Sequence, residues 1–207
     1  MPVDKIGKFI VLEGIDGSGK STQAHFLANR LNAVLTFAPG ATDIGKNLRS
    51  YVLGKKNISY TAETLLMLSD RALHVDQIIN PNLVAGKWVV CDRFNGSTLA
   101  YQGYGRGLDI TALNLLISFS SQHVSPDLNI LLDISVDEAL KRQGNRSKDR
   151  DRLESQSGEF YERVRNGYLE IAGTNPDSWV VVDGSLSSDL VQAEIYEIVN
   201  SKFSLSN

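Results

Sequence analysis

The sequence predicts an α/β fold in which a parallel β-sheet is covered by helices on both faces. Two observations lead to this prediction. Short apolar runs alternate along the chain with stretches whose apolar residues recur at helical spacing. A glycine-rich loop from Gly14 to Ser21 joins the first such run to the first helical stretch. Because the sequence has no internal repeat and no linker rich in Pro, Gly or Ser, we expect one domain over residues 1–207.

Five apolar runs have the length and composition of buried strands. In chain order they are Lys8–Glu13, Val34–Phe37, Trp88–Cys91, Leu128–Asp133 and Trp179–Val182. In parallel sheets, ligands bind at the carboxyl ends of the strands. The loops that follow Glu13, Phe37, Cys91 and Asp133 are therefore the places where we expect a functional site.

Seven stretches at helical spacing lie between or after these strands. They are Thr22–Leu31, Ile44–Leu53, Thr61–Ile79, Ile110–Ser120, Val136–Arg142, Phe160–Ala172 and Asp189–Val199. A capping box from Ser135 to Glu138 begins one of them, and Pro81 is expected to end the longest. The apolar residues Phe160, Val164 and Tyr168 follow a helical stripe that we expect to face the core.

The loop from Gly14 to Ser21 fits the phosphate-binding pattern G-x-x-x-x-G-K-[ST] at every fixed position. Its glycines allow backbone N–H groups to point at phosphate oxygens, and a helix starting near Gly19 aims its positive end at the same anion. Lys20 can reach the outer phosphates, and the Ser21 hydroxyl can bind Mg²⁺. The expected nucleotide-binding residues are Gly14, Asp16, Gly17, Ser18, Gly19, Lys20, Ser21 and Thr22.

A second acidic signal follows the third apolar run. Asp92 lies directly after this strand, where an Asp supports Mg²⁺ in proteins with a phosphate-binding loop. The alternative is an Asp that merely starts a turn. Arg93 would compete with the metal unless an anion holds it. The glycines from residue 103 to 107 predict flexible backbone near the site.

Two further groups of basic residues are candidates for binding an anion or a polar ligand. Arg71 lies four residues after Met67 on one helix face, so it is either a binding residue or an ordinary solvated one. Residues 141–152 contain Lys or Arg at six of twelve positions, which predicts a mobile lid or a plain solvated loop. In the lid interpretation Arg142, Arg146, Arg150 and Arg152 move onto the phosphates during reaction.

The composition excludes several classes of protein. The net charge of −3 argues against extensive nucleic-acid binding, and no apolar run is long enough to span a membrane. The single cysteine, Cys91, cannot form a disulfide within the chain, and residues 1–8 lack the apolar core of a signal peptide. We therefore expect a cytoplasmic protein with no nucleic-acid or membrane partner.

Taken together, these motifs resemble bacterial thymidylate kinase, the dTMP kinase family, over most of the chain. The residues that carry the resemblance are Phe9–Gln23, Pro39-Gly-Ala-Thr42, Asp70-Arg71-Ala-Leu-His74, Asp92-Arg93, Ala100-Tyr-Gln-Gly-Tyr-Gly-Arg-Gly107, Pro126-Asp-Leu128, Leu131-Leu-Asp133, Asp151-Arg-Leu-Glu154, Val164-Arg165 and Tyr168-Leu169. The resemblance implies a P-loop kinase fold with a five-stranded parallel sheet, a short mobile lid at about 142–154, and usually a homodimer. It implies ATP-dependent phosphorylation of dTMP to dTDP, with ATP and Mg²⁺ as cofactors.

The resemblance also implies roles for individual residues. Asp16 would lie near the 3′-OH of the acceptor, Arg93 would hold its phosphate, and Arg71 would hydrogen-bond the thymine. Tyr101 would pack against the sugar and disfavour a ribose 2′-OH, while Thr98 and Gln102 would lie near the base. The catalytic set would then be Lys20, Asp16, Arg93, Arg146, Arg150 and Arg152, with Ser21 and Asp92 on the metal.

This chain departs from the family pattern at three places. Phe37 occupies a position where the family usually has Arg, so a contact to the acceptor phosphate is either missing or supplied elsewhere. Met67 replaces a Phe that stacks on thymine, and a methionine is softer and more adaptable. The lid is also about one residue longer than is usual in the family. A kinase with relaxed or modified-pyrimidine specificity is therefore an alternative.

Two further alternatives differ in chemistry. A deoxynucleoside kinase must deprotonate a hydroxyl group and often carries a Glu before the Pro that follows the second strand, where this chain has Ala38. A non-catalytic nucleotide-binding switch would need no acceptor site, so Arg71, Arg93 and the Tyr101-Gln102 pair argue against it.

Overall fold

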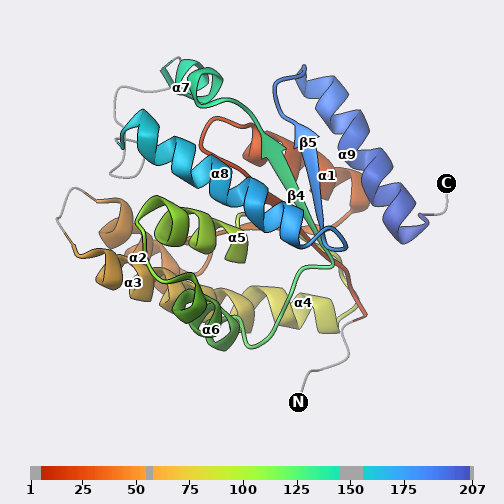
Figure 1. Ribbon diagram of the computed structural model, residues 1–207. Helices are drawn as coiled ribbons and strands as arrows, with labels where there is room; N and C mark the ends of the chain where they lie inside the picture. Colours follow the sequence, from red (N-terminus) through yellow and green to blue (C-terminus); the bar gives the residue numbers. More distant parts are fainter. Residues whose placement is uncertain (1–5, 55–57, 145–155, 206–207) are drawn as a thin grey trace.

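The computed structural model describes residues 6–54, 58–144 and 156–205, and it contains a parallel five-stranded sheet between two layers of helices (Figure 1). The strands are β1 Phe9–Glu13, β2 Val34–Phe37, β3 Val89–Asp92, β4 Leu128–Asp133 and β5 Trp179–Asp183. Their order across the sheet is β2-β3-β1-β4-β5, and every pair is parallel. The predicted five-stranded parallel sheet is confirmed.

The helices connect these strands and continue beyond the last one. They are α1 Lys20–Leu31, α2 Asp43–Leu53, α3 Tyr60–His74, α4 Asn80–Val84, α5 Asn95–Thr98, α6 Ile110–Ser120, α7 Val136–Gly144, α8 Gly158–Thr174 and α9 Ser188–Phe203, with π-helical segments η1 Val75–Ile79 and η2 Leu99–Gly105. Most bounds lie within a few residues of the predicted ones. The cap of α7 is also confirmed in part, since the Ser135 hydroxyl accepts from the Glu138 N–H.

The core has two halves because successive residues of a strand face opposite sides of the sheet. Ile10 and Leu12 pack with α1 and α9 on one face. Phe9 and Val11 pack with η1 and α4 on the other. Within the described residues, none of the helices has both the length and the apolar character needed to span a bilayer.

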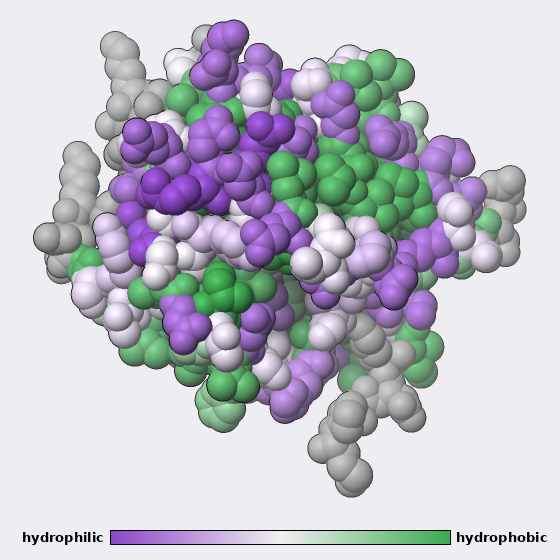
Figure 2. Space-filling view, viewed as in Figure 1, coloured by the Kyte–Doolittle hydropathy of each residue, from purple (hydrophilic) through white to green (hydrophobic). Residues whose placement is uncertain are grey.

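Helix α8 completes the second face. Polar residues cover its outer side, and hydrophobic ones gather beside β5 at the edge of the sheet (Figure 2). Phe160, Val164 and Tyr168 are buried against η2 and β4, so the expected apolar stripe is confirmed as core.

The prediction that Pro81 ends the long helix is wrong. The chain continues helically from α3 through η1 into α4, and Pro81 lies in the first turn of α4. A proline is tolerated in the first turn of an α-helix, where its missing N–H has no partner within that helix. The wider turn of η1 resets the hydrogen-bond register just before the proline, so the helical path is not broken.

The prediction of flexible backbone around residues 103–107 is also wrong. Residues 95–105 are helical, as α5 followed by η2. Gly103 and Gly105 serve close packing, since a Cβ on Gly105 would lie 2.7 Å from the Phe160 ring and one on Gly103 would clash with Ile110. Helix α8 can therefore pack directly against the η2 backbone. Gly107 follows the helical segment with a φ of 77° and has no close neighbour at its Cβ position.

Candidate active site

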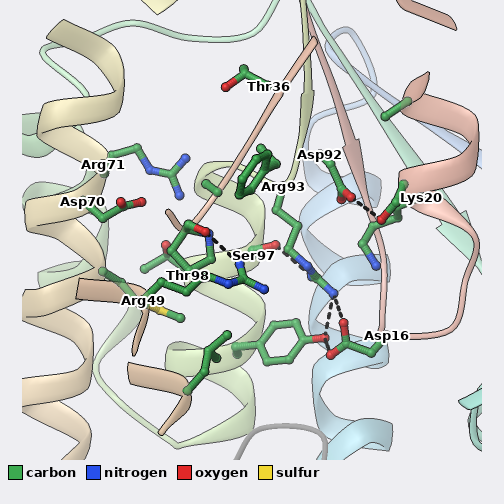
Figure 3. A pocket seen from close by; sticks show the side chains of 18 of the residues that line it. Asp16, Lys20, Thr36, Arg49, Asp70, Arg71, Asp92, Arg93, Ser97 and Thr98 are labelled. Atoms are coloured by element: carbon green, nitrogen blue, oxygen red, sulfur yellow. Dashed lines mark hydrogen bonds and ion pairs between the residues drawn. The ribbon is translucent and has the colours of Figure 1, made fainter. Parts of the chain in front are cut away.

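A cavity of about 450 Å³ opens at the carboxyl edge of β2 and β3, between α1, α2, α3 and the 93–102 segment. Figure 3 shows Lys20 and Asp16 on one side of this cavity and Arg71 and Asp70 on the opposite side, with Arg93 between them. The predicted residues that line it are Asp16, Gly17, Gly19, Lys20, Ser21, Thr22, Met67, Arg71, Asp92, Arg93, Thr98, Tyr101 and Gln102. Segments far apart in the sequence thus meet in one cavity, as expected.

The glycine-rich loop takes a conformation that needs glycine. Gly14, Gly17 and Gly19 have φ angles of 143°, 92° and 95°, which L-residues with a side chain rarely adopt. Gly19 caps α1, so the positive end of this helix is directed at the cavity. A Cβ on Gly17 would lie 2.7 Å from the Ala139 carbonyl oxygen, so the loop also packs closely on α7.

The Lys20 ammonium group is buried and donates a hydrogen bond to the Ile15 carbonyl at 2.9 Å. Burial and then the nearby Arg93 charge lower the pKa of Lys20 to about 8, although the carboxylates of Asp16, Asp92 and Glu13 oppose this shift. An anion bound in the loop would stabilise the charged form of Lys20.

Ser21 and Asp92 meet as the motifs predict. The Ser21 hydroxyl donates to Oδ2 of Asp92 at 2.5 Å, and Oδ1 of Asp92 is buried with no hydrogen-bond partner among the described residues. A hydroxyl and a carboxylate next to a phosphate-binding loop are the hard oxygen ligands that Mg²⁺ prefers. The donor set therefore fits this ion.

Arg93 is the main charged residue in the centre of the cavity. Its φ of 73° lies in the left-handed region, which directs its side chain away from its neighbour Asp92. The guanidinium forms an ion pair with Asp16 at 2.5 Å and donates to the Gly14 carbonyl at 3.1 Å. Because Asp16 is the anion that holds it, Arg93 does not compete for the metal position.

The Asp16 carboxylate is held by two donors. Oδ1 pairs with Arg93, and Oδ2 accepts from the Tyr101 hydroxyl at 2.9 Å. Burial acts to raise the pKa of Asp16, but the charges of Arg93 and Lys20 and these hydrogen bonds outweigh burial and lower it. Burial raises the pKa of Tyr101 well above its ordinary value, so this phenol remains a donor.

Sequence reasoning missed Glu13, which organises the backbone around Arg93. This carboxylate is fully buried. Its Oε1 accepts from the N–H groups of Phe94 (2.8 Å) and Ser97 (3.1 Å), and its Oε2 accepts from the hydroxyls of Ser97 (2.6 Å) and Tyr168 (2.9 Å). The available signal was an acid at the end of an apolar strand, the same signal that identified Asp92.

The far side of the cavity carries unpaired donors. Arg71 is buried and lies over the Phe94 ring at 4.1 Å, and its Nε and Nη1 have no hydrogen-bond partner among the described residues. Met67 and Thr98 line the same wall. An acceptor atom on a bound molecule would satisfy the Arg71 donors.

Helix α2, which follows the loop after β2, supplies a cation that the motifs did not predict. Phe37 is 46% exposed and lines the cavity, as does Arg49 from α2. Arg49 donates to the Pro39 carbonyl at 2.7 Å, and the Gly40 N–H donates to Asp70 at 3.0 Å. A guanidinium therefore lies at the cavity wall although Phe37 stands where the family usually has Arg.

Some predicted site residues do not line the cavity, and others lie outside the described part of the chain. Gly14 and Ser18 do not line the cavity, although Gly14 accepts a hydrogen bond from Arg93. Arg142 pairs with Glu138 and donates to the Gly184 carbonyl. Arg146, Arg150, Arg152 and most of the predicted 142–154 lid lie outside the described residues.

Comparisons with known proteins agree with this geometry. The family model for thymidylate kinase matches residues 12–195. A thymidylate kinase of Nostoc punctiforme is 42% identical over 201 residues, covering 93% of this chain and 95% of the relative. One of Carboxydothermus hydrogenoformans is 43% identical over 198 residues, covering 91% of this chain and 95% of the relative.

A solved structure supports the same assignment. A thymidylate kinase of Ehrlichia chaffeensis superposes with a TM-score of 0.77 at 34% sequence identity, covering 93% of this chain and 98% of that one. The chain therefore belongs to the thymidylate kinase family.

Proposed function

We propose that this cavity catalyses the ATP-dependent phosphorylation of dTMP to dTDP. One observation carries the proposal: most of the phosphate-binding loop and a second set of cationic side chains, Arg71, Arg93 and Arg49, line the same cavity. A nucleotide-binding switch needs only the first of these. Two phosphate-binding regions on one cavity are what a phosphoryl transfer between two nucleotides requires.

On the donor side, the backbone N–H groups of the glycine-rich loop would bind the phosphates of ATP, and Lys20 would contact the outer ones. Ser21 and Asp92 would hold Mg²⁺, which neutralises charge on the transferred group when it is bound. Thr22 lines the cavity beside them.

On the acceptor side, Arg93 would hold the phosphate of dTMP, with Arg49 as a further cation at the cavity wall. The second pKa of a phosphate monoester is about 6, so the acceptor is largely dianionic at neutral pH and needs no general base. Catalysis then consists of alignment and charge neutralisation. Asp16 would bind the 3′-OH of the sugar, and Tyr101 would pack against the sugar and leave little room for a ribose 2′-OH.

The thymine base would lie against Met67, Thr98 and Gln102, with Arg71 donating to a carbonyl oxygen of the base. Ala38 also lines the cavity. Since its methyl group cannot serve as the base that a nucleoside kinase requires, the cavity favours an acceptor that is already an anion.

The test is an ADP-release assay with ATP and Mg²⁺ against dTMP, dUMP, dCMP, dGMP, UMP and thymidine. We expect a strong preference for dTMP. Comparable rates with several deoxynucleotides would replace the proposal by a kinase with relaxed specificity. Turnover of thymidine without turnover of dTMP would show a nucleoside kinase, and binding of ATP with no acceptor reaction would show a switch.

We further propose that the chain is a single nucleoside monophosphate kinase domain that forms a homodimer in the cytoplasm. Exposed apolar side chains on the adjacent helices α3 and α6 support a second copy of the chain as partner: Leu65 of α3 is 51% exposed, and Leu115 and Phe119 of α6 are 71% and 83% exposed. Sedimentation of Phe119→Glu against the unchanged chain tests this. A monomeric parent would contradict the homodimer, and a dimer that persists in the variant would contradict the contact through Phe119.

A further inference from the structure

A buried polar cluster lies behind the cavity wall that would face the base. Glu63 of α3 and Gln102 of η2 are both fully buried, and only Gln102 lines the cavity. Nε2 of Gln102 donates to Oε1 of Glu63 at 2.8 Å. The Arg106 guanidinium lies 3.7 Å from Oε2 of Glu63, so the carboxylate has a counter-charge.

The chemistry of this pair fixes the orientation of the Gln102 amide. An ionised carboxylate can only accept hydrogen bonds, so the side of the amide that faces Glu63 must be its N–H₂ group. The carbonyl oxygen is then left over. Oε1 of Gln102 is buried and has no hydrogen-bond partner among the described residues. Leaving a buried acceptor without a hydrogen bond is unfavourable, so a donor on a bound molecule would be favoured there.

Arg71 and Gln102 both line the cavity, and together they offer a bound base a donor and an acceptor. Arg71 presents unpaired donors, and Gln102 presents an unpaired acceptor. Thymine and uracil carry a carbonyl oxygen beside a ring N–H, which matches a donor next to an acceptor. Cytosine carries an amino group beside an unprotonated ring nitrogen, which is the reverse pattern.

We propose that Glu63 is a positioning residue that holds the Gln102 amide with its acceptor toward the base and thereby selects thymine over cytosine. This inference rests on the proposed function, in which the base binds between Arg71 and Gln102. Glu63 acts only through Gln102, since it does not line the cavity.

Further contacts hold Arg106 beside Glu63. Arg106 donates to Oε1 of Gln156 at 2.8 Å and lies 4.5 Å from the Tyr60 ring and 4.8 Å from the Phe160 ring. A buried carboxylate is tolerated only when it is paired. The pairing of Glu63 with Arg106, next to Gln102, is thus a built feature of the fold.

The experiment compares kcat/KM for dTMP, dUMP and dCMP in the parent chain and in Glu63→Gln. The amide in this variant can either accept from or donate to Gln102, so the bias on the Gln102 orientation is lost. We expect the dTMP-to-dCMP ratio to fall by about tenfold, mostly through the KM of dTMP, as the loss of one hydrogen bond implies. The dTMP-to-dUMP ratio should not change, because both bases carry the ring N–H.

Two variants separate this inference from the function on which it rests. Gln102→Met removes the acceptor, so it should lower the dTMP-to-dCMP ratio as well, and adding Glu63→Gln to it should change the ratio no further. A reduced ratio in Gln102→Met with an unchanged ratio in Glu63→Gln would overturn the role of Glu63 alone. An unchanged ratio in Gln102→Met would overturn the placement of the base.

A merely structural defect in Glu63→Gln would lower the rates with all three acceptors alike and leave both ratios unchanged. That result would overturn the proposal. Glu194→Gln on the exposed side of α9 is the matched control for the same chemical change. If Glu63→Gln does not fold, Glu63→Gln with Arg106→Gln removes both charges of the buried pair and provides the same comparison.

Discussion

Arg93 lies next to Asp92 in the sequence, yet its guanidinium pairs with Asp16, 77 residues away in the chain, at 2.5 Å. The backbone of Arg93 is left-handed, with a φ of 73°, and its side chain points away from Asp92 and toward the glycine-rich loop. One ion pair thus joins this loop to the segment that follows β3. Asp16 and Arg93 are both mostly buried, with side-chain exposures of 27% and 15%.

Asp16→Asn should reduce catalysis far more than it reduces ATP binding. The amide keeps the shape of the side chain but removes the charge that positions Arg93. A misplacement of about 1 Å in a phosphoryl-transfer site can cost about 10²-fold in rate, so we expect a loss of this order in kcat/KM for dTMP. Steady-state kinetics with each substrate varied in turn will measure it.

The matched control is Asp133→Asn, which removes a bidentate Asp133–Arg165 pair of similar exposure that does not line the cavity. It should leave kcat/KM for dTMP within about threefold of the parent, as expected for a site outside the reacting groups. An equal loss in both variants would show a general effect of removing an ion pair.

From the lowered pKa of Lys20 we predict that kcat/KM for ATP depends on pH. The pKa of Lys20 in the free protein is about 8, lowered by burial and by Arg93, so the charged form is present below this pH and is lost as the pH rises through it. Because kcat/KM reports on the free enzyme, its value for ATP should fall above pH 8, by up to about tenfold per pH unit.

Two controls accompany the pH profile. In Lys20→Arg the side chain stays charged, so the decrease above pH 8 should be absent. In kcat, which reports on the bound complex, the decrease should move to higher pH because bound phosphates stabilise the ammonium. A kcat/KM profile for ATP that is flat to pH 9.5, about 1.5 pH units above the Lys20 pKa, would rule out this assignment.

Because the Ser21 hydroxyl and the Asp92 carboxylate are in contact, we expect both to bind Mg²⁺. Ser21→Ala removes one oxygen ligand and leaves the carboxylate in place. The Mg²⁺ concentration at half-maximal activity should rise by about tenfold or more, with partial recovery of kcat at high Mg²⁺. Ser21→Thr keeps the hydroxyl and should behave like the parent in the same titration. If Ser21→Ala and Ser21→Thr needed the same Mg²⁺ concentration for half-maximal activity, Ser21 would not be a metal ligand.

Of the predicted residues that line the cavity, those of the glycine-rich loop and Asp92 have a local signature, whereas Thr98, Tyr101 and Gln102 were expected only from the family resemblance. The loop from Gly14 to Ser21 has fixed spacing, and its contacts form within a few residues. The meeting of Ser21 with Asp92 follows from the rule that parallel strands end at the same edge of a sheet. Contacts of this kind can be predicted from the order of the elements and the alternation of strands and helices alone.

The relationships that were missed depend on tertiary packing. Arg49 reaches the cavity only because α2 lies across the loop after β2, and Glu63 matters only because η2 packs behind α3. The helix through Pro81 and the ordered segment at residues 95–105 both contain π-helical turns, whose wider hydrogen-bond spacing has no signature in apolar periodicity. Pro81 therefore suggests a helix end, and the glycines at residues 103–107 suggest flexible backbone, although the chain stays helical through Pro81 and through Gly103 and Gly105.

Glu13 is the missed residue with the largest predicted effect on stability. Its carboxylate accepts four hydrogen bonds while fully buried, and it holds the backbone N–H groups that follow Arg93. Glu13→Gln replaces one accepting oxygen with an N–H₂ group, which then faces groups that donate. We expect a loss of about 2 kcal/mol in the free energy of unfolding and a decrease of about 4–8 °C in Tm.

Calorimetry and urea unfolding will measure the effect of Glu13→Gln, with Tyr168→Phe as the partial comparison. Tyr168→Phe removes one donor to Glu13 and one partner of Ser97, so it should cost about 1 kcal/mol. Arg93 should also lose its fixed position in Glu13→Gln, so kcat for dTMP should fall even at temperatures where the variant is fully folded. A folded Glu13→Gln protein with the parent's Tm and kcat would show that these hydrogen bonds do not organise the site.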